Sequence, residues 1–143
     1  MKLLKPNFWQ KKISITSILL FPITVIYSII IKVRKIFSFS KQFNIPIICV
    51  GNIYIGGTGK TPLSISIAEQ IKAFKKPAII KKFYNNHEDE HNLINSKTDC
   101  LIIDPNRSKA IEQAIKKGFN VAILDDGFQD YSIKKNLNII CFN

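Results

Sequence analysis

Residues 50–61, VGNIYIGGTGKT, decide the fold of this chain. They follow residues 45–50, a short run of branched apolar residues typical of a buried parallel strand. They precede residues 61–74, in which apolar residues recur with helical spacing. Glycines let backbone N–H groups turn toward a phosphate, and the amino end of the following helix adds a positive dipole. A phosphate-binding loop is therefore predicted here.

The individual residues of this loop predict a nucleoside triphosphate site. Lys60 is expected to reach the β- and γ-phosphates, and the Thr61 hydroxyl is expected to ligate Mg²⁺. The strict G-x-x-x-x-G-K-[ST] pattern is not met, because Tyr54 stands where its first glycine would be. The alternative is an ordinary glycine-rich turn between a strand and a helix. The predicted phosphate-binding residues are Gly56, Gly57, Thr58, Gly59, Lys60 and Thr61.

Beyond the loop, strand-like and helical segments alternate. Strands are expected at residues 77–80, 100–103, 121–124 and 137–142, and an amphipathic helix is expected at 108–117, ended by Gly118. The polar stretch 83–96 is assigned a helix only in its later part. This alternation with short loops predicts an α/β fold, P-loop NTPase-like, with a mostly parallel sheet and flanking helices.

An apolar strand that ends in two aspartates supplies the second half of the predicted site. Residues 121–124 are apolar and lead directly into Asp125 and Asp126. We expect Asp125 to hold Mg²⁺ directly or through water, with Asp126 as a second acidic group, because Mg²⁺ prefers oxygen ligands. A strand ending in aspartate is a weak signal alone, and the phosphate loop is what gives it weight.

Composition limits the classes of function. The chain has 143 residues, a formal net charge of +11 and 46% hydrophobic residues, which suits one domain with a core. Such a charge fits nucleic acid, anionic membranes or phosphorylated ligands, and it also fits a lysine-rich bias without function. No nucleic-acid partner is expected, since no recognisable binding motif or aromatic series is present. Cys49, Cys100 and Cys141 are interpreted as small buried apolar residues without disulfide or metal roles.

An uncharged apolar run, ISITSILLFPITVIYSIII at residues 13–31, precedes the predicted domain. A helix that spans a bilayer needs ~17–25 such residues, so the run just qualifies, although Pro22 is expected to kink it. Lysines and an arginine flank the run. We expect residues 1–40 to form a membrane-associated helical segment and residues 41–143 to form the nucleotide-binding domain. The alternative is a buried helix packed on that domain.

A competing motif lies at residues 87–91, HEDEH, which fits the H-E-x-x-H zinc pattern with Glu88 as the base. The flanking asparagines do not form the long amphipathic helix that this pattern requires. Glu112 is only a nominal candidate for a third ligand. A zinc site at His87 and His91 is therefore the weaker hypothesis.

Taken together, the motifs resemble the tetraacyldisaccharide 4′-kinase family of lipid A biosynthesis over nearly the whole chain. Residues 50–52 and 56–62 are similar to the family's variant phosphate loop, and residues 125–129, DDGFQ, match its most distinctive motif. The resemblance implies an ATP-dependent kinase that phosphorylates the 4′-hydroxyl of a tetraacyl disaccharide 1-phosphate. It further implies ATP and Mg²⁺ as cofactors, an acylated disaccharide lipid as substrate, and a place at the cytoplasmic face of the inner membrane.

The resemblance also implies residue roles. Lys60 and Thr61 would bind ATP phosphate and Mg²⁺, and Asp125 and Asp126 would belong to the metal site. Asp89, within the E-D-E at residues 88–90, looks like the counterpart of the family's catalytic base, which accepts the proton of a sugar hydroxyl. One departure is clear, since KKFYNN at residues 81–86 stands where the family has S-R-G-Y-G-G.

The chain is also about half as long as members of that family. The resemblance implies a second domain with a histidine that pairs with the catalytic aspartate, and no histidine here is placed to match it. We expect a truncated form whose carboxyl-terminal half is missing or supplied separately, with little or no kinase activity alone. The alternative is a membrane-associated nucleotide-binding module without transferase activity.

Overall fold

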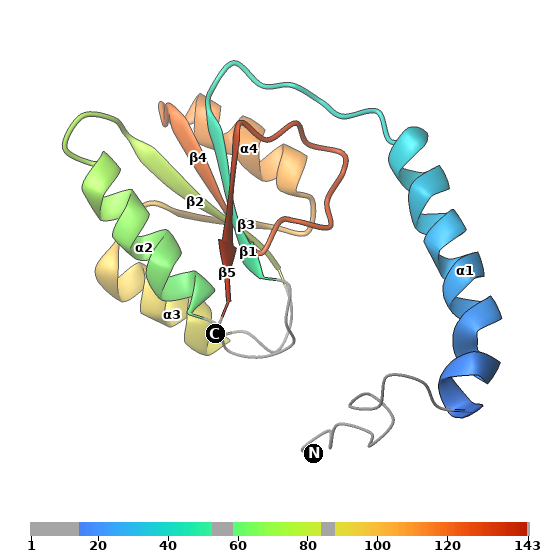
Figure 1. The fold of residues 1–143 in the computed structure, drawn as a ribbon. Helices are drawn as coiled ribbons and strands as arrows, with labels where there is room; N and C mark the ends of the chain where they lie inside the picture. The colour runs from blue at the N-terminus through green and yellow to red at the C-terminus, as the bar shows by residue number, and fades with distance from the viewer. Residues whose placement is uncertain (1–14, 53–58, 84–87, 143) are drawn as a thin grey trace. The chain divides into compact units, whose positions relative to one another are not determined.

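The computed structural model describes residues 15–52, 59–83 and 88–142 of the chain (Figure 1). The chain divides into two compact units, Met1–Ser38 and Phe39–Asn143.

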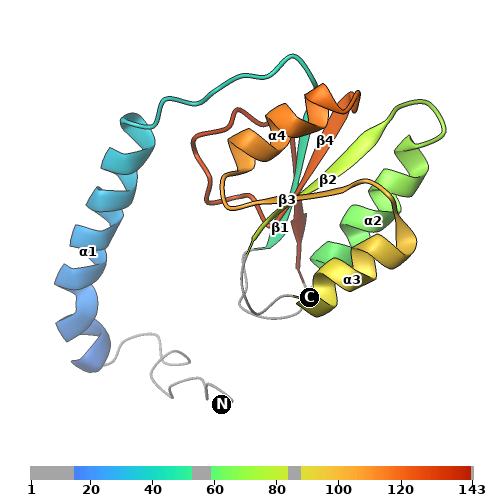
Figure 2. The same cartoon turned by 180° about the vertical axis from the view of Figure 1, so that it is seen from behind.

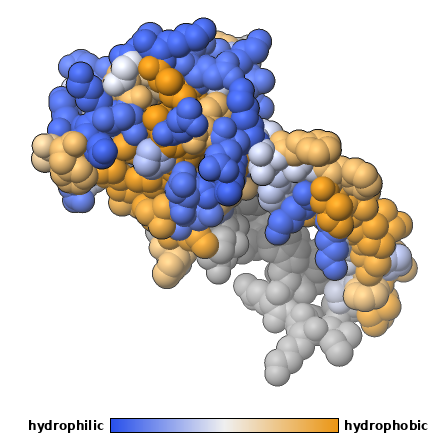
Figure 3. All heavy atoms as spheres, turned by 90° about the horizontal axis from the view of Figure 1, so that it is seen from above, coloured by the Kyte–Doolittle hydropathy of each residue, from blue (hydrophilic) through white to orange (hydrophobic). Residues whose placement is uncertain are grey.

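The described part of the first unit, residues 15–38, is mostly the helix α1 (Ile15–Ile36), with Pro22 inside it. Two of its hydroxyl groups bond back to the helix: Thr24 Oγ1 donates to the Phe21 carbonyl, and Ser28 Oγ donates to the Thr24 carbonyl, each at 2.7 Å. Side chains coloured as hydrophobic predominate on this helix in Figure 3. By length and composition, Ser17–Ile36 could cross a membrane, a test that core helices and signal sequences also pass.

The second unit is an α/β domain built on a five-stranded sheet. All strand pairs are parallel, and the order is β3-β2-β4-β1-β5. The predicted fold class, a parallel sheet with flanking helices, is confirmed. Its strands are β1 (Ile47–Asn52), β2 (Pro77–Lys82), β3 (Leu101–Asp104), β4 (Val121–Asp125) and β5 (Leu137–Cys141), and its helices are α2 (Lys60–Ile71), α3 (Glu88–Lys97) and α4 (Arg107–Lys116).

The helices cover both faces of the sheet, because the direction of strand addition reverses once. From β1 to β2 to β3 the chain moves toward one side of the sheet, and α2 and α3 cover one face. From β3 to β4 it moves back, and α4 lies on the opposite face (Figures 1 and 2). Crossovers between parallel strands are right-handed, so a reversal of direction requires a change of face.

Two hydrophobic clusters, one on each face of the sheet, form the core. The cluster under α2 and α3 includes Val50, Ile79 and Ile123 from the strands. Successive side chains of a strand point to opposite faces, so residues two positions further along return to the same face. The strand ends that follow these core residues therefore also face α2. They are Asn52 in β1, Lys81 in β2 and Asp125 in β4.

Four of the five strands extend past the apolar runs that predicted them, whereas β5, expected to end at residue 142, ends at Cys141. β2 was expected to end at residue 80, but Lys82 still pairs with Asp104, and Asn52 of β1 pairs with Cys141. Pairing continues because backbone groups make the ladder, whatever the side chain. The predicted helix ending is confirmed, since Gly118 follows α4 with φ +82°.

Candidate functional site

The candidate site lies at the carboxyl edge of the sheet, where β1, β4 and β2 end side by side. The strand register places Asp125 opposite Val50 on one neighbour and opposite Lys81 on the other. Because the sheet is parallel, segments far apart in sequence end at this one edge. Ligand sites of open α/β sheets occur outside the carboxyl ends of strands.

Asp125 is the centre of a buried polar cluster. Its residue is 2% exposed, and three side chains donate to its carboxylate. The Thr61 hydroxyl lies 3.0 Å from Oδ2, and the Ser64 hydroxyl lies 3.3 Å from Oδ1. The Lys81 ammonium lies 2.9 Å from Oδ2. A buried carboxylate must be paired and hydrogen-bonded, and these donors meet that need.

The two hydroxyls come from one face of α2. Thr61 and Ser64 stand three positions apart, which places them on the same side of a helix. Both residues are buried against the sheet. Helix α2 therefore begins over Asp125, with its positive amino end at the carboxyl edge.

Lys60 and Asp126 form a second, more accessible pair beside the first. The Lys60 ammonium donates to Asn52 Oδ1 at 3.0 Å and lies 3.4 Å from Asp126 Oδ1. The Lys60 side chain is 21% exposed and that of Asp126 is 63% exposed. An ammonium held at the surface by two oxygen partners can take up a phosphate oxygen in exchange.

The backbone at Asp126 is held in a strained conformation. Its φ is +60°, the left-handed region that favours glycine. The Asp126 N–H donates to the Val50 carbonyl at 2.9 Å, and Arg107 Nη2 donates to the Asp126 carbonyl. Such strain persists only where surrounding contacts determine the conformation. The two bonds hold the turn so that the Asp126 carboxylate meets Lys60.

The next residues pack directly on the sheet. A Cβ added at Gly127 would lie 3.1 Å from Cys49 Sγ, and one added at Gly51 would lie 2.2 Å from the Phe128 ring. The D-D-G-F-Q segment thus lies against β1, with no room for a methyl group at Gly51 and a tight fit for one at Gly127.

The structure brings together residues from both halves of the predicted site. Thr61 contacts Asp125, and Lys60 lies beside Asp126. Gly59 is the N-cap of α2, with φ +75°. Gly56, Gly57 and Thr58 lie outside the described residues.

Asp89 belongs to the first turn of α3, whose amino end lies at the carboxyl edge of the sheet (Figure 1). The placement of the Asp89 side chain is not among the described features. For the zinc hypothesis, His87 is outside the described residues, and Glu112 is paired with Lys41. Within residues 15–52, 59–83 and 88–142, no group of three potential metal ligands from His, Cys, Asp and Glu is assembled.

Sequence reasoning missed four residues of this edge: Asn52, Ser64, Lys81 and Arg107. Lys81 was noted only as a departure from a family pattern. Its signal was a charged residue two positions after a core isoleucine, in a strand that ends beside Asp125. Arg107 gave no signal, because its contact with Asp126 depends on the path of α4.

The cysteine interpretation holds in part. All three cysteines are free, and Cys49 and Cys141 are buried, but Cys100 is partly exposed, so the expectation of burial was wrong for Cys100. Burial raises the pKa of the Cys49 thiol, against the opposing charge of Lys135. Burial likewise lowers the pKa of Lys135.

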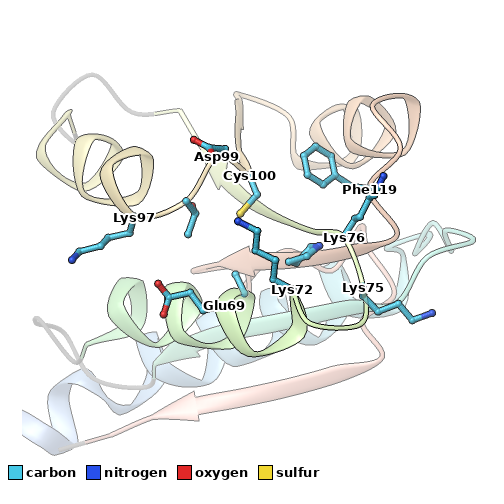
Figure 4. Close-up of a pocket in the computed structure, with 11 residues that line it drawn as sticks. Glu69, Lys72, Lys75, Lys76, Lys97, Asp99, Cys100 and Phe119 are labelled. Carbon is cyan, nitrogen blue, oxygen red and sulfur yellow. The ribbon is translucent and has the colours of Figure 1, made fainter.

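A cavity of about 460 Å³ lies at the opposite, amino edge of the sheet. Its wall includes Glu69 from α2 and Lys72 directly after that helix, Lys97 at the end of α3, Asp99 before β3 and Phe119 before β4 (Figure 4). None of the predicted site residues lines this cavity.

The carboxyl edge has the ligand chemistry of a magnesium site. Mg²⁺ takes carboxylate and hydroxyl oxygens, and Asp125 and Thr61 offer both within 3.0 Å of each other. Asp126 adds a second carboxylate at the surface. These residues fit the ion that the loop predicts.

Comparison with known proteins gives one family. The family model described as "LpxK: Tetraacyldisaccharide-1-P 4'-kinase" matches residues 16–99 and 85–143. A tetraacyldisaccharide 4′-kinase of Pelagibacter ubique is 50% identical over 145 residues, covering 100% of this chain and 46% of the relative. One of Aliarcobacter butzleri is 35% identical over 152 residues, covering 91% and 46%.

A crystal structure of LpxK from Aquifex aeolicus in complex with ATP is also similar. It superimposes with a TM-score of 0.70 at 27% identity, covering 88% of this chain and 49% of that chain. The chain thus spans about half the length of the curated relatives and of the solved structure that it matches.

Proposed function

The chain belongs to the tetraacyldisaccharide-1-P 4′-kinase family, and from this premise we propose that it supplies the nucleotide-binding part of an ATP-dependent lipid kinase. The reaction is phosphorylation of the 4′-hydroxyl of a tetraacyl disaccharide 1-phosphate in lipid A biosynthesis. One observation carries the proposal. The Thr61 hydroxyl bonds to Asp125 and the Lys60 ammonium lies beside Asp126, and both pairs lie at the carboxyl end of β1, where the phosphate loop begins.

The triphosphate binds over the amino end of α2. Gly56, Gly57, Thr58 and Gly59 offer backbone N–H groups, and the helix dipole favours an anion at this point. The Lys60 ammonium exchanges its contacts with Asn52 and Asp126 for phosphate oxygens. This exchange is inexpensive because Lys60 is already held at the edge, with its charge partly accessible to solvent.

Thr61, Asp125 and Asp126 would hold the magnesium ion. Bound there, the ion would neutralise charge on the phosphates and help to orient the transferred group. The Asp125 carboxylate is oriented in advance, because Ser64 donates to its Oδ1 while Thr61 and Lys81 both donate to its Oδ2. Preorganised groups in a dry site stabilise developing charge without further rearrangement.

Asp89 acts as the general base. It orients the 4′-hydroxyl of the acceptor and accepts its proton, a contribution of typically ~10²–10⁴-fold. Support comes from the position of Asp89 in the first turn of α3, a helix whose amino end lies at the same edge of the sheet as Lys60 and Asp125 (Figure 1).

Helix α1 associates with the cytoplasmic face of the inner membrane, where the acylated acceptor lies. Its apolar length suits lipid, and the hydroxyls of Thr24 and Ser28 are satisfied within the helix, as a hydrocarbon environment requires. Arg34 and Lys35 in its last turn suit anionic head groups.

Nucleotide binding is the first test. The full chain in detergent is titrated with a fluorescent ATP analogue, with and without Mg²⁺. We expect magnesium-dependent binding, and we expect Lys60→Met to weaken it at least tenfold, which corresponds to about 1.4 kcal/mol. Lys72→Met is the matched control, since Lys72 lies at the amino edge of the sheet. Absence of magnesium-dependent binding in the parent chain would remove the proposal.

Phosphoryl transfer is the second test. Radiolabelled ATP and the tetraacyl disaccharide 1-phosphate are supplied with the chain and with the carboxyl-terminal half of the Pelagibacter ubique relative as a separate polypeptide. Transfer that is lost with Asp89→Asn supports the kinase. Tight nucleotide binding without transfer in this mixture favours the nucleotide-binding module that lacks transferase activity.

A further inference from the structure

Lys81 is a buried cation at the place where the metal site is proposed. Its side chain is 8% exposed, and that of Asp125 is 1% exposed. The Lys81 ammonium lies 2.9 Å from Asp125 Oδ2, the same oxygen that accepts the Thr61 hydroxyl at 3.0 Å. One carboxylate oxygen is therefore shared by a lysine and by the residue that would ligate the ion.

The position follows from the strand register. Lys81 pairs directly with Asp125 across β2 and β4, and both side chains point toward α2. Taking a carboxylate out of water carries a large desolvation cost unless a positive charge compensates it. Here the protein supplies that charge from its own chain.

A divalent cation at Asp125 would meet an ammonium already in place. Like charges a few ångströms apart in a partly buried site repel each other strongly. The same ammonium holds the Asp125 carboxylate in one orientation when no cation is present. Repulsion weakens metal binding, whereas orientation of the carboxylate favours it. Thr61 and Ser64 also orient Asp125, so the orienting effect of Lys81 is small and its repulsion of the metal is the larger effect.

We propose that Lys81 is a positioning residue that compensates Asp125 in place of a divalent cation and thereby weakens the affinity of this site for metal. The inference rests on the proposed role of Asp125 as a metal ligand. It predicts that the site accepts metal readily only together with a polyanionic ligand, which offsets the Lys81 charge.

The test measures Mn²⁺ binding to the full chain in detergent, without nucleotide, by the loss of the free-ion electron spin resonance signal. Mn²⁺ accepts the same oxygen ligands as Mg²⁺. We expect Lys81→Met to lower the Kd for Mn²⁺ at least about tenfold, since one neighbouring positive charge is removed. We also expect Mn²⁺ to raise the melting temperature of this variant more than that of the parent.

Lys82→Met is the matched control. Lys82 is the next residue of β2, so its side chain leaves the sheet on the opposite face, and it lines a small polar pocket with Asn106 and Arg107. The control should bind Mn²⁺ as the parent chain does. Equal Mn²⁺ affinity in the parent chain and in Lys81→Met would overturn the inference.

A second variant keeps the inference testable if Lys81→Met does not fold. The double variant Lys81→Met/Asp125→Asn removes both charges, so we expect it to fold and to show no response to Mn²⁺. If Lys81→Met is unfolded alone, Mn²⁺ should restore its circular dichroism spectrum, and a chain that stays unfolded would overturn the inference.

These readouts are separate from the proposed function. The Mn²⁺ measurements are made without nucleotide. If the parent chain did not bind ATP, the kinase proposal would be removed, but the Mn²⁺ affinities of the parent chain and of Lys81→Met could still be compared. Conversely, ATP binding with an unchanged Mn²⁺ affinity in Lys81→Met would remove only the role of Lys81.

Discussion

Both edges of the sheet carry charged side chains, but these are buried at the carboxyl edge and exposed at the amino edge. At the carboxyl edge, Asp125 and Lys81 are buried, and the Asp125 carboxylate accepts from Lys81 and from the Thr61 and Ser64 hydroxyls of α2. At the amino edge, Glu69, Lys72 and Asp99 stand exposed around a cavity (Figure 4). A charge at the end of a buried strand must find a partner, whereas a charge in an exposed turn is already solvated. The carboxyl edge, where burial brings charged side chains into contact, is therefore the better candidate for the functional site.

The largest effect that would sharpen this contrast concerns the acidic groups. Asp125→Asn should lower the free energy of unfolding by about 3–5 kcal/mol, because it breaks the buried ion pair between Asp125 and the Lys81 ammonium. Urea denaturation of the full chain in detergent measures the change. Asp99→Asn at the amino edge is the matched control and should change stability by less than about 0.5 kcal/mol. Equal costs at the two edges would break the comparison.

A smaller effect is expected at the glycines. Gly51→Ala should cost about 1–3 kcal/mol, since its methyl group would lie 2.2 Å from the Phe128 ring. Gly118→Ala, after α4 at the amino edge, should cost about 1 kcal/mol through its φ of +82° alone, with nothing within 4 Å of the added Cβ.

A double-mutant cycle separates the two causes. Phe128→Leu should recover part of the loss in Gly51→Ala and none of the loss in Gly118→Ala. If the Phe128 change relieves neither variant, then the packing of the D-D-G-F-Q segment on β1 is not what restricts residue 51.

The smallest expected effect compares two thiols. Cys100 lines the cavity at the amino edge (Figure 4) and is partly exposed. Cys49 is buried beneath Gly127. Burial raises the pKa of Cys49. At a pH below that pKa, a smaller fraction of Cys49 is reactive thiolate than for a thiol with the ordinary pKa. A maleimide should label Cys100 about tenfold faster than Cys49, a difference of about 1.4 kcal/mol.

Mass spectrometry of the labelled peptides measures the two rates. Raising the pH toward the pKa of Cys49 should reduce the difference between the two labelling rates, because the thiolate fraction of Cys49 still increases there. Faster labelling of Cys49 than of Cys100 at neutral pH would contradict the burial of the carboxyl edge.

Much of the fold could be read from residue patterns. The apolar runs located the strands, and Gly118 marked the end of α4. Four strand ends were placed too early, because backbone pairing continues past the apolar residues, as it does through Asn52 and Lys82. The end of β5 was placed one residue too late. Helix α3 was only partly anticipated, since its sequence is polar and, among its side chains that the structure describes, Ile94 is the one buried in the core.

The sequence by itself determined the family, the phosphate loop and the acidic strand end, because each depends on neighbouring residues along the chain. Only the tertiary structure decided that Lys81 lies on Asp125 and that Arg107 holds the Asp126 carbonyl. Those contacts join residues 44 and 19 positions apart. They depend on which strands are neighbours and on which face each side chain leaves the sheet, and no local pattern of residues encodes either property.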